Sequence, residues 1–95
     1  MSRWRRKPLV IEAWQFMPTA QREVLPGWID RRWFHDEGEV ASDTAAEYPH
    51  TPYMLIPTPG GVLRAEVTDW IIHGVKGDVY PCKAVVFDAS FERMP

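Results

Sequence analysis

The chain has 95 residues, a length typical of one domain, with 45% apolar and 13% aromatic residues. Its net charge of −2 and the absence of a basic stripe disfavour general nucleic-acid binding. No apolar run approaches the ~20 residues of a membrane-spanning helix. The single cysteine rules out an intrachain disulfide framework. We therefore expect one cytoplasmic domain over residues 1–95, with no membrane contact.

The charges are distributed unevenly along the chain. The net charge is +4 over residues 1–32, −5 over 33–63 and −1 over 64–95. Residues 1–7 hold the only basic run and are expected to form a flexible tail. Residues 35–52 carry the acidic cluster without a clear period, which predicts an irregular acidic loop, or alternatively a weak strand around Val40.

The first elements are expected to be a strand, a turn and a short helix. Residues 8–17 alternate in side-chain direction and are rich in β-branched and aromatic residues, which predicts a strand. A short turn is expected through 20–24. Pro26 suits a first helical position, and Ile29 and Trp33 lie four apart, so a helix over 26–34 is predicted.

Two hairpins are predicted in the second half of the chain. Residues 58–61, Thr-Pro-Gly-Gly, have the signature of a type II turn, with glycine at the third position. The register then places Ile56 opposite Leu63, Met54 opposite Ala65 and Leu55 opposite Arg64. A second hairpin with a four-residue loop, 74–77, is expected to pair the following residues: His73 with Asp78, Ile72 with Val79, Ile71 with Tyr80 and Trp70 with Pro81. In that register Trp70, Ile72, Val79 and Pro81 face the core.

The C-terminal residues complete the expected fold. Residues 83–87 read as a helical turn, and 89–94 as a closing strand that pairs with residues 8–17. The predicted class is α+β: a small, mainly antiparallel, twisted sheet forming a partly closed barrel, with one or two short helices.

Two segments resemble a family of small proteins of tailed phages and prophages. Residues 69–92, DWIIHGVKGDVYPCKAVVFDASFE, are similar to the family's C-terminal signature, GDWII-x-GVKGE-x-YPCKPDIF-x-x-TY. Residues 7–16, KPLVIEAWQF, are similar to its first strand. The chain departs from the signature at Thr68, where the family has glycine, at Ala84, where it has proline, and at Phe91, where it has tyrosine. The resemblance implies a phage-encoded accessory protein and brings no established activity.

Cys82 and the histidines are candidate catalytic or metal-binding groups. The expected register places Cys82 opposite Asp69, whose negative charge would raise the pKa of the thiol, so an inert cysteine is expected. His35, Asp36, Glu37 and His50 lack a recognised ligand spacing. We therefore expect no catalytic residue, no metal site and no cofactor.

Two clusters combine cations with an aromatic ring and could bind a planar anion. One consists of Arg31, Arg32 and Trp33. The other consists of Arg64, Lys76, Tyr80 and Lys83.

Three functions follow as hypotheses. The first is a non-catalytic binding protein that counteracts a host antiviral defence, either by sequestering an anionic, nucleotide-like small molecule or by covering a host protein. The second is a structural or assembly module of the phage. The third is a small hydrolase that uses acids of the 36–47 loop. Exposed sheet edges and surplus tryptophan also predict a homodimer or higher homo-oligomer.

Overall fold

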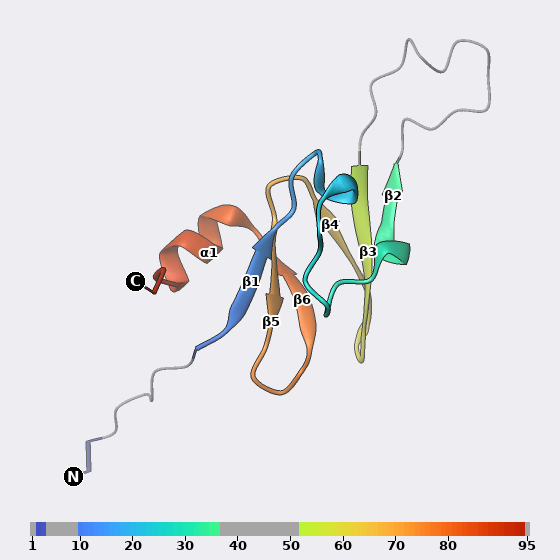
Figure 1. The fold of residues 1–95 in the computed structure, drawn as a ribbon. Helices are drawn as coiled ribbons and strands as arrows, with labels where there is room; N and C mark the ends of the chain where they lie inside the picture. Colours follow the sequence, from blue (N-terminus) through green and yellow to red (C-terminus); the bar gives the residue numbers. More distant parts are fainter. Residues whose placement is uncertain (1, 4–9, 37–51, 95) are drawn as a thin grey trace, which may run out of the picture.

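The computed structural model describes residues 2–3, 10–36 and 52–94 (Figure 1). No helix within these residues is long and apolar enough to cross a membrane. Val40 and most of the predicted basic tail and acidic loop lie outside the described residues. The elements, in chain order, are β1 (Glu12–Gln15), the 3-10 turns η1 (Ala20–Arg22) and η2 (Arg31–Trp33), β2 (Phe34–Asp36), β3 (Pro52–Thr58), β4 (Gly61–Glu66), β5 (Trp70–His73), β6 (Val79–Cys82) and α1 (Ala84–Ser90).

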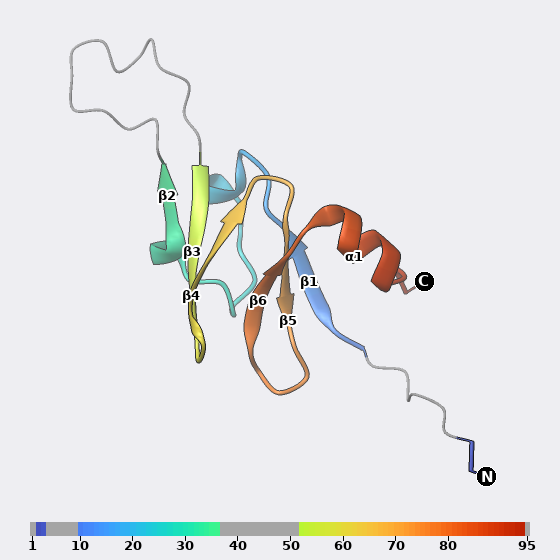
Figure 2. The same cartoon turned by 180° about the vertical axis from the view of Figure 1, so that it is seen from behind.

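The strands form two antiparallel sheets, in the orders β1-β5-β6 and β2-β3-β4. Figures 1 and 2 show the two sheets side by side, with α1 at the outer side of the first. The expected α+β class with antiparallel strands is confirmed. The partly closed barrel is wrong, because β4 and β5 follow one another in sequence but belong to different sheets.

The core lies between the two sheets. Phe16 and Ile71 enter it from the first sheet, and Met54, Ile56 and Ala65 enter it from the second, all of them with no exposed surface. Phe16 and Phe34 are edge to face, with ring centroids 5.7 Å apart. Side chains from both sheets therefore interdigitate, and their burial stabilises the contact between the sheets.

The first hairpin, β3–β4, has the register that the sequence predicts: Ile56 lies opposite Leu63, Met54 opposite Ala65 and Leu55 opposite Arg64. The type II turn is wrong, because the positive φ of +124° falls on Gly61 rather than on Gly60. The Thr58 hydroxyl donates to the Gly61 carbonyl at 2.6 Å and closes the turn.

The second hairpin, β5–β6, differs from the predicted register by one residue. Trp70 lies opposite Cys82, Ile71 opposite Pro81, Ile72 opposite Tyr80 and His73 opposite Val79. The loop includes Asp78, because Gly77 adopts a φ of +87° and Gly74 N donates to Asp78 O at 2.7 Å.

A change of one residue in the register moves the side chains of one strand to the opposite face of the sheet relative to those of its partner. Ile71 and Val79 pack on the core between the sheets. Trp70 lies on the other face, where its ring stacks on Phe87 of α1 at 4.2 Å. Trp70 is therefore half-buried under a helix, and its predicted place in the core with Val79 and Pro81 is wrong.

The helix predicted over 26–34 is reduced to the single 3-10 turn η2. The Asp30 carboxylate accepts from Arg32 N at 2.8 Å and caps this turn, and the chain then enters β2 at Phe34. Ile29 is nevertheless 6% exposed and Trp33 packs against the core, so the apolar pair was identified correctly. The ends of the predicted irregular loop also differ, because residues 35–36 belong to β2 and residue 52 to β3.

The C-terminal segment is more helical than expected. The helical turn is confirmed and extends to Ser90, and residues 91–94 form no strand. Phe87 and Phe91 lie four apart, which brings their rings within 5.0 Å of one another beside Trp70. β1 pairs with β5 instead of a closing strand.

Thr68 is the one non-glycine residue with a positive φ, +81°, in the described part of the chain. It lies between β4 and β5, where its amide donates to the Phe16 carbonyl at 2.7 Å. This conformation strains a β-branched residue. Thr68 also occupies the position where the resembled phage signature has glycine.

We predict that Thr68→Gly stabilises the protein. Relief of the positive φ contributes roughly 1–2 kcal/mol, and the greater freedom of glycine in the unfolded chain offsets about 0.5–1 kcal/mol of it. Chemical denaturation should show a net gain, with Thr68→Ala as the control that keeps a Cβ at the strained position. A lower unfolding free energy for Thr68→Gly than for the parent would contradict the strain.

Candidate functional site

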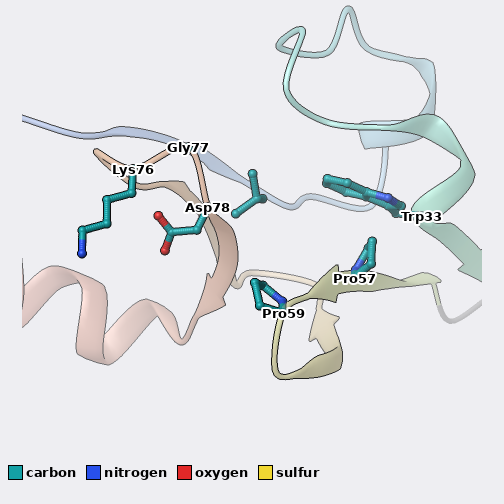
Figure 3. Close-up of a pocket in the computed structure, with 7 residues that line it drawn as sticks. Trp33, Pro57, Pro59, Lys76, Gly77 and Asp78 are labelled. Carbon is teal, nitrogen blue, oxygen red and sulfur yellow. The ribbon is translucent and has the colours of Figure 1, made fainter.

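A hollow of about 380 Å³ opens between the two hairpin turns (Figure 3). Trp33 of η2, Pro57 at the end of β3 and Pro59 of the following turn line one part of it. The loop 74–78 and the start of β6 line the other part, through Lys76, Gly77, Asp78 and Val79. Both hairpins and η2 therefore contribute to one concave surface.

The floor of the hollow is apolar and well supported. Trp33 and Val79 pack against the core, and Trp33 N donates to Asp30 O at 3.1 Å. In Figure 3 the Trp33 ring and Pro57 lie at one end and Lys76 lies at the other, with its side chain pointing away from the ring. Pro59 and Asp78 lie between the two ends. An aromatic ring and rigid prolines offer flat surfaces that change little on binding, and a lysine adds a positive charge.

The loop 74–78 has a fixed shape. Gly77 N donates to Gly74 O at 3.0 Å, and the left-handed conformation of Gly77 lets the chain return to β6. The Asp78 carboxylate lies against Gly74, where a Cβ would come within 2.6 Å of Asp78 Oδ1. Asp78 therefore lines the hollow while its carboxylate is turned onto its own loop.

The four residues of the predicted second cluster are not brought together. Lys76 lies in the loop at one end of the β5–β6 hairpin, and Lys83 follows β6 at the other end. Arg64 contacts Glu66 at 2.6 Å, and its guanidinium lies 4.0 Å above the Tyr53 ring. Tyr80 is opposite Ile72, on the face of the sheet that carries Trp70. Lys76 is the member of this cluster that lines the hollow.

In the predicted first cluster, both arginines have structural contacts. Arg31 donates to the carbonyls of Gln21, at 2.6 Å, and Glu23, at 2.8 Å. Arg32 forms an ion pair with Asp30 at 2.8 Å, which lowers the pKa of that carboxyl through hydrogen bonding. Trp33 is the member that lines the hollow. The hollow thus joins one residue from each predicted cluster.

Sequence reasoning missed the remaining lining residues. Proline is typical of turns and strand ends and valine is typical of strands, so Pro57, Pro59 and Val79 do not stand out in the sequence as binding residues. Their proximity depends on how the two hairpins are placed, which no local pattern reports. A second missed feature is the outer face of β2–β3–β4, where His35 stacks on Tyr53 at 5.3 Å.

Another polar contact lies on the first sheet. The Glu12 carboxylate accepts from the Trp28 indole at 2.8 Å and lies 4.0 Å from His73 Nδ1. Trp28 and His73 stack with centroids 5.2 Å apart. Within the residues that the structure describes, no three His, Cys, Asp or Glu side chains converge as a metal site would require. Glu37 and His50 lie outside those residues.

Cys82 lies beside the buried carboxylate of Asp69. Asp69 is 3% exposed and accepts from Lys83 Nζ at 2.9 Å and from Glu66 N at 2.8 Å. Partial burial, followed by the charge of Asp69, raises the pKa of the Cys82 thiol. The directly opposite residue is Trp70 rather than Asp69, but the expected direction of the pKa shift is found.

We predict that Cys82 reacts slowly with iodoacetamide at neutral pH. Its rate should rise at higher pH than that of a free peptide thiol, because the thiolate is disfavoured. Asp69→Asn should shift the pH dependence of the Cys82 reaction rate part of the way toward that of the free peptide thiol. The substitution removes the negative charge, whereas Cys82 remains partly buried. A parent profile at or below that of the free thiol would show that neither effect operates.

No family model, curated protein or solved structure matches the chain. The resemblance to the phage family therefore keeps the status of an expectation. The hollow between the hairpins, with its apolar floor and Lys76, is the feature on which a function can be argued.

Proposed function

We propose that this chain is a non-catalytic binding protein and that its ligand is a planar, anionic, nucleotide-like small molecule. The observation that carries the proposal is the hollow lined by Trp33, Pro57, Pro59, Val79 and Lys76. Its volume of about 380 Å³ falls within the ~300–1,000 Å³ of small-molecule sites, and such sites combine an apolar lining with a few charged groups.

The lining suggests how such a ligand would lie. A planar ring would contact Trp33 and the prolines, whose rigid surfaces lose little entropy on binding. The anionic group would then extend toward Lys76, the cation of the hollow. Asp78 also lines the hollow, and the negative charge of its side chain disfavours an anion that approaches from that side.

The biological setting rests on the phage resemblance. We propose that the protein acts in the cytoplasm of an infected host, where it withholds a nucleotide-like signal from an antiviral defence. Binding without turnover would suffice for this role, since the signal is removed from its receptor by mass action.

The test is a thermal-shift screen of nucleotides and cyclic oligonucleotides, followed by calorimetry on any compound that binds. A specific ligand should raise the melting temperature of the parent in a concentration-dependent way. Lys76→Gln should weaken binding by about tenfold, equivalent to ~1.4 kcal/mol, and Asp78→Asn should strengthen it. Trp33→Leu should abolish binding, because the stacking surface is lost.

Two variants serve as matched controls. Trp28→Leu makes the same change at another partly buried tryptophan, and Arg93→Gln removes an exposed positive charge outside the hollow. Both should bind the ligand as the parent does. The proposal fails if no compound stabilises the parent, or if Trp33→Leu and Lys76→Gln respond as strongly as the controls.

A further inference from the structure

The outer edge of β1 presents backbone groups that no described strand pairs with. Phe16 N donates to Asp69 O and Phe16 O accepts from Thr68 N, so Phe16 directs both groups toward the β5 side. Backbone direction alternates along an antiparallel strand. Trp14 therefore also bonds to β5, whereas the N–H and C=O groups of Ile11, Ala13 and Gln15 point to the open edge.

The opposite edge of the same sheet is protected. Gly74 N donates to Asp78 O, and alternation from this bond directs Tyr80 and Cys82 toward β5. Pro81 therefore occupies an outward-pointing position, where it removes the donor that an added strand would need. No proline or lysine occupies β1, whose sequence is Glu-Ala-Trp-Gln.

Helix α1 extends beyond this open edge. Figures 1 and 2 both show α1 continuing past β1, away from β5 and β6. The helix buries none of its own residues, and Val85 and Val86 are 82% and 55% exposed. Its Phe87 ring stacks on Trp70, which is in register with Gln15 of β1. A strand added to β1 would therefore lie next to an apolar helix that lacks cover.

We propose that β1 pairs with β1 of a second copy of this chain, antiparallel, with Ala13 on the twofold axis. In this register the two Ala13 residues exchange both backbone hydrogen bonds, and Ile11 pairs with Gln15 of the other copy. The outward-pointing backbone N–H and C=O groups of all three residues then form hydrogen bonds with the other copy. A continuous six-stranded sheet results, and each α1 lies over the junction.

The side chains suit self-pairing. Alanine at the axis is small, so the two copies meet without crowding beneath the helices. Glu12 faces Trp14 of the other copy rather than a second Glu12, and its carboxylate is already bonded to the Trp28 indole. Within β1, no like charges therefore face one another across the axis, and the same patch serves both subunits, as an isologous interface requires.

Light scattering at tens of micromolar protein should give a mass of twice 11.0 kDa for the parent. Ala13→Lys places two like charges at the axis and should give a monomer with unchanged circular dichroism. Val62→Lys is the matched control, because Val62 is 62% exposed on β4, away from β1, and this variant should remain a dimer. A monomeric parent overturns the proposal, as does a dimeric Ala13→Lys variant.

Hydrogen exchange locates the interface independently of any substitution. The amides of Ile11, Ala13 and Gln15 should be protected in the parent and should lose protection on dilution. The amides of Trp14 and Phe16 should stay protected in both states, since they bond to the β5 side of the same chain. A dimer in which the three outward amides exchange freely would show that the copies join elsewhere, and would overturn β1 pairing.

Discussion

The buried carboxylate of Asp69 is the contact on which the arrangement of the two sheets depends. It accepts from the backbone of Glu66 at the end of β4 and from Lys83 at the start of α1. The backbone of the same residue bonds to Glu66 O at 3.0 Å and to Phe16 N at 2.9 Å. One residue thus connects β1, both hairpins and the helix. Because the Asp69 side chain is 5% exposed, water has little access to these contacts.

This junction also determines where the two proposed surfaces lie. The turn at Thr68 lets β4 and β5 belong to different sheets, so that Ile71 faces the common core and Trp70 faces α1. The far end of the β5–β6 hairpin then reaches the turn after β3, and the hollow forms between them. The proposed dimer edge lies on β1, on the other side of β5. The proposed ligand binding and self-association would therefore use separate surfaces of the protein.

Local signals were sufficient for part of this fold. The Pro-Gly-Gly turn fixed the β3–β4 register, because loop length alone sets which residues pair. The β5–β6 register was off by one because Gly77, in a left-handed conformation, admits Asp78 to the loop, and glycine gives no advance sign of which conformation it takes. Of the residues that line the hollow, Trp33 and Lys76 stood out in the sequence by residue type, but their proximity depends on the packing of two hairpins.

The role of Asp69 is tested most directly by the unfolding free energies of Asp69→Ala and Lys83→Met. Asp69→Ala leaves the part-buried Glu66 amide without its carboxylate partner and should lower stability by about 2–3 kcal/mol. Lys83 is 64% exposed, so Lys83→Met should cost within about 1 kcal/mol. Equal and small losses in the two variants would contradict the view that Asp69 holds the sheets in place.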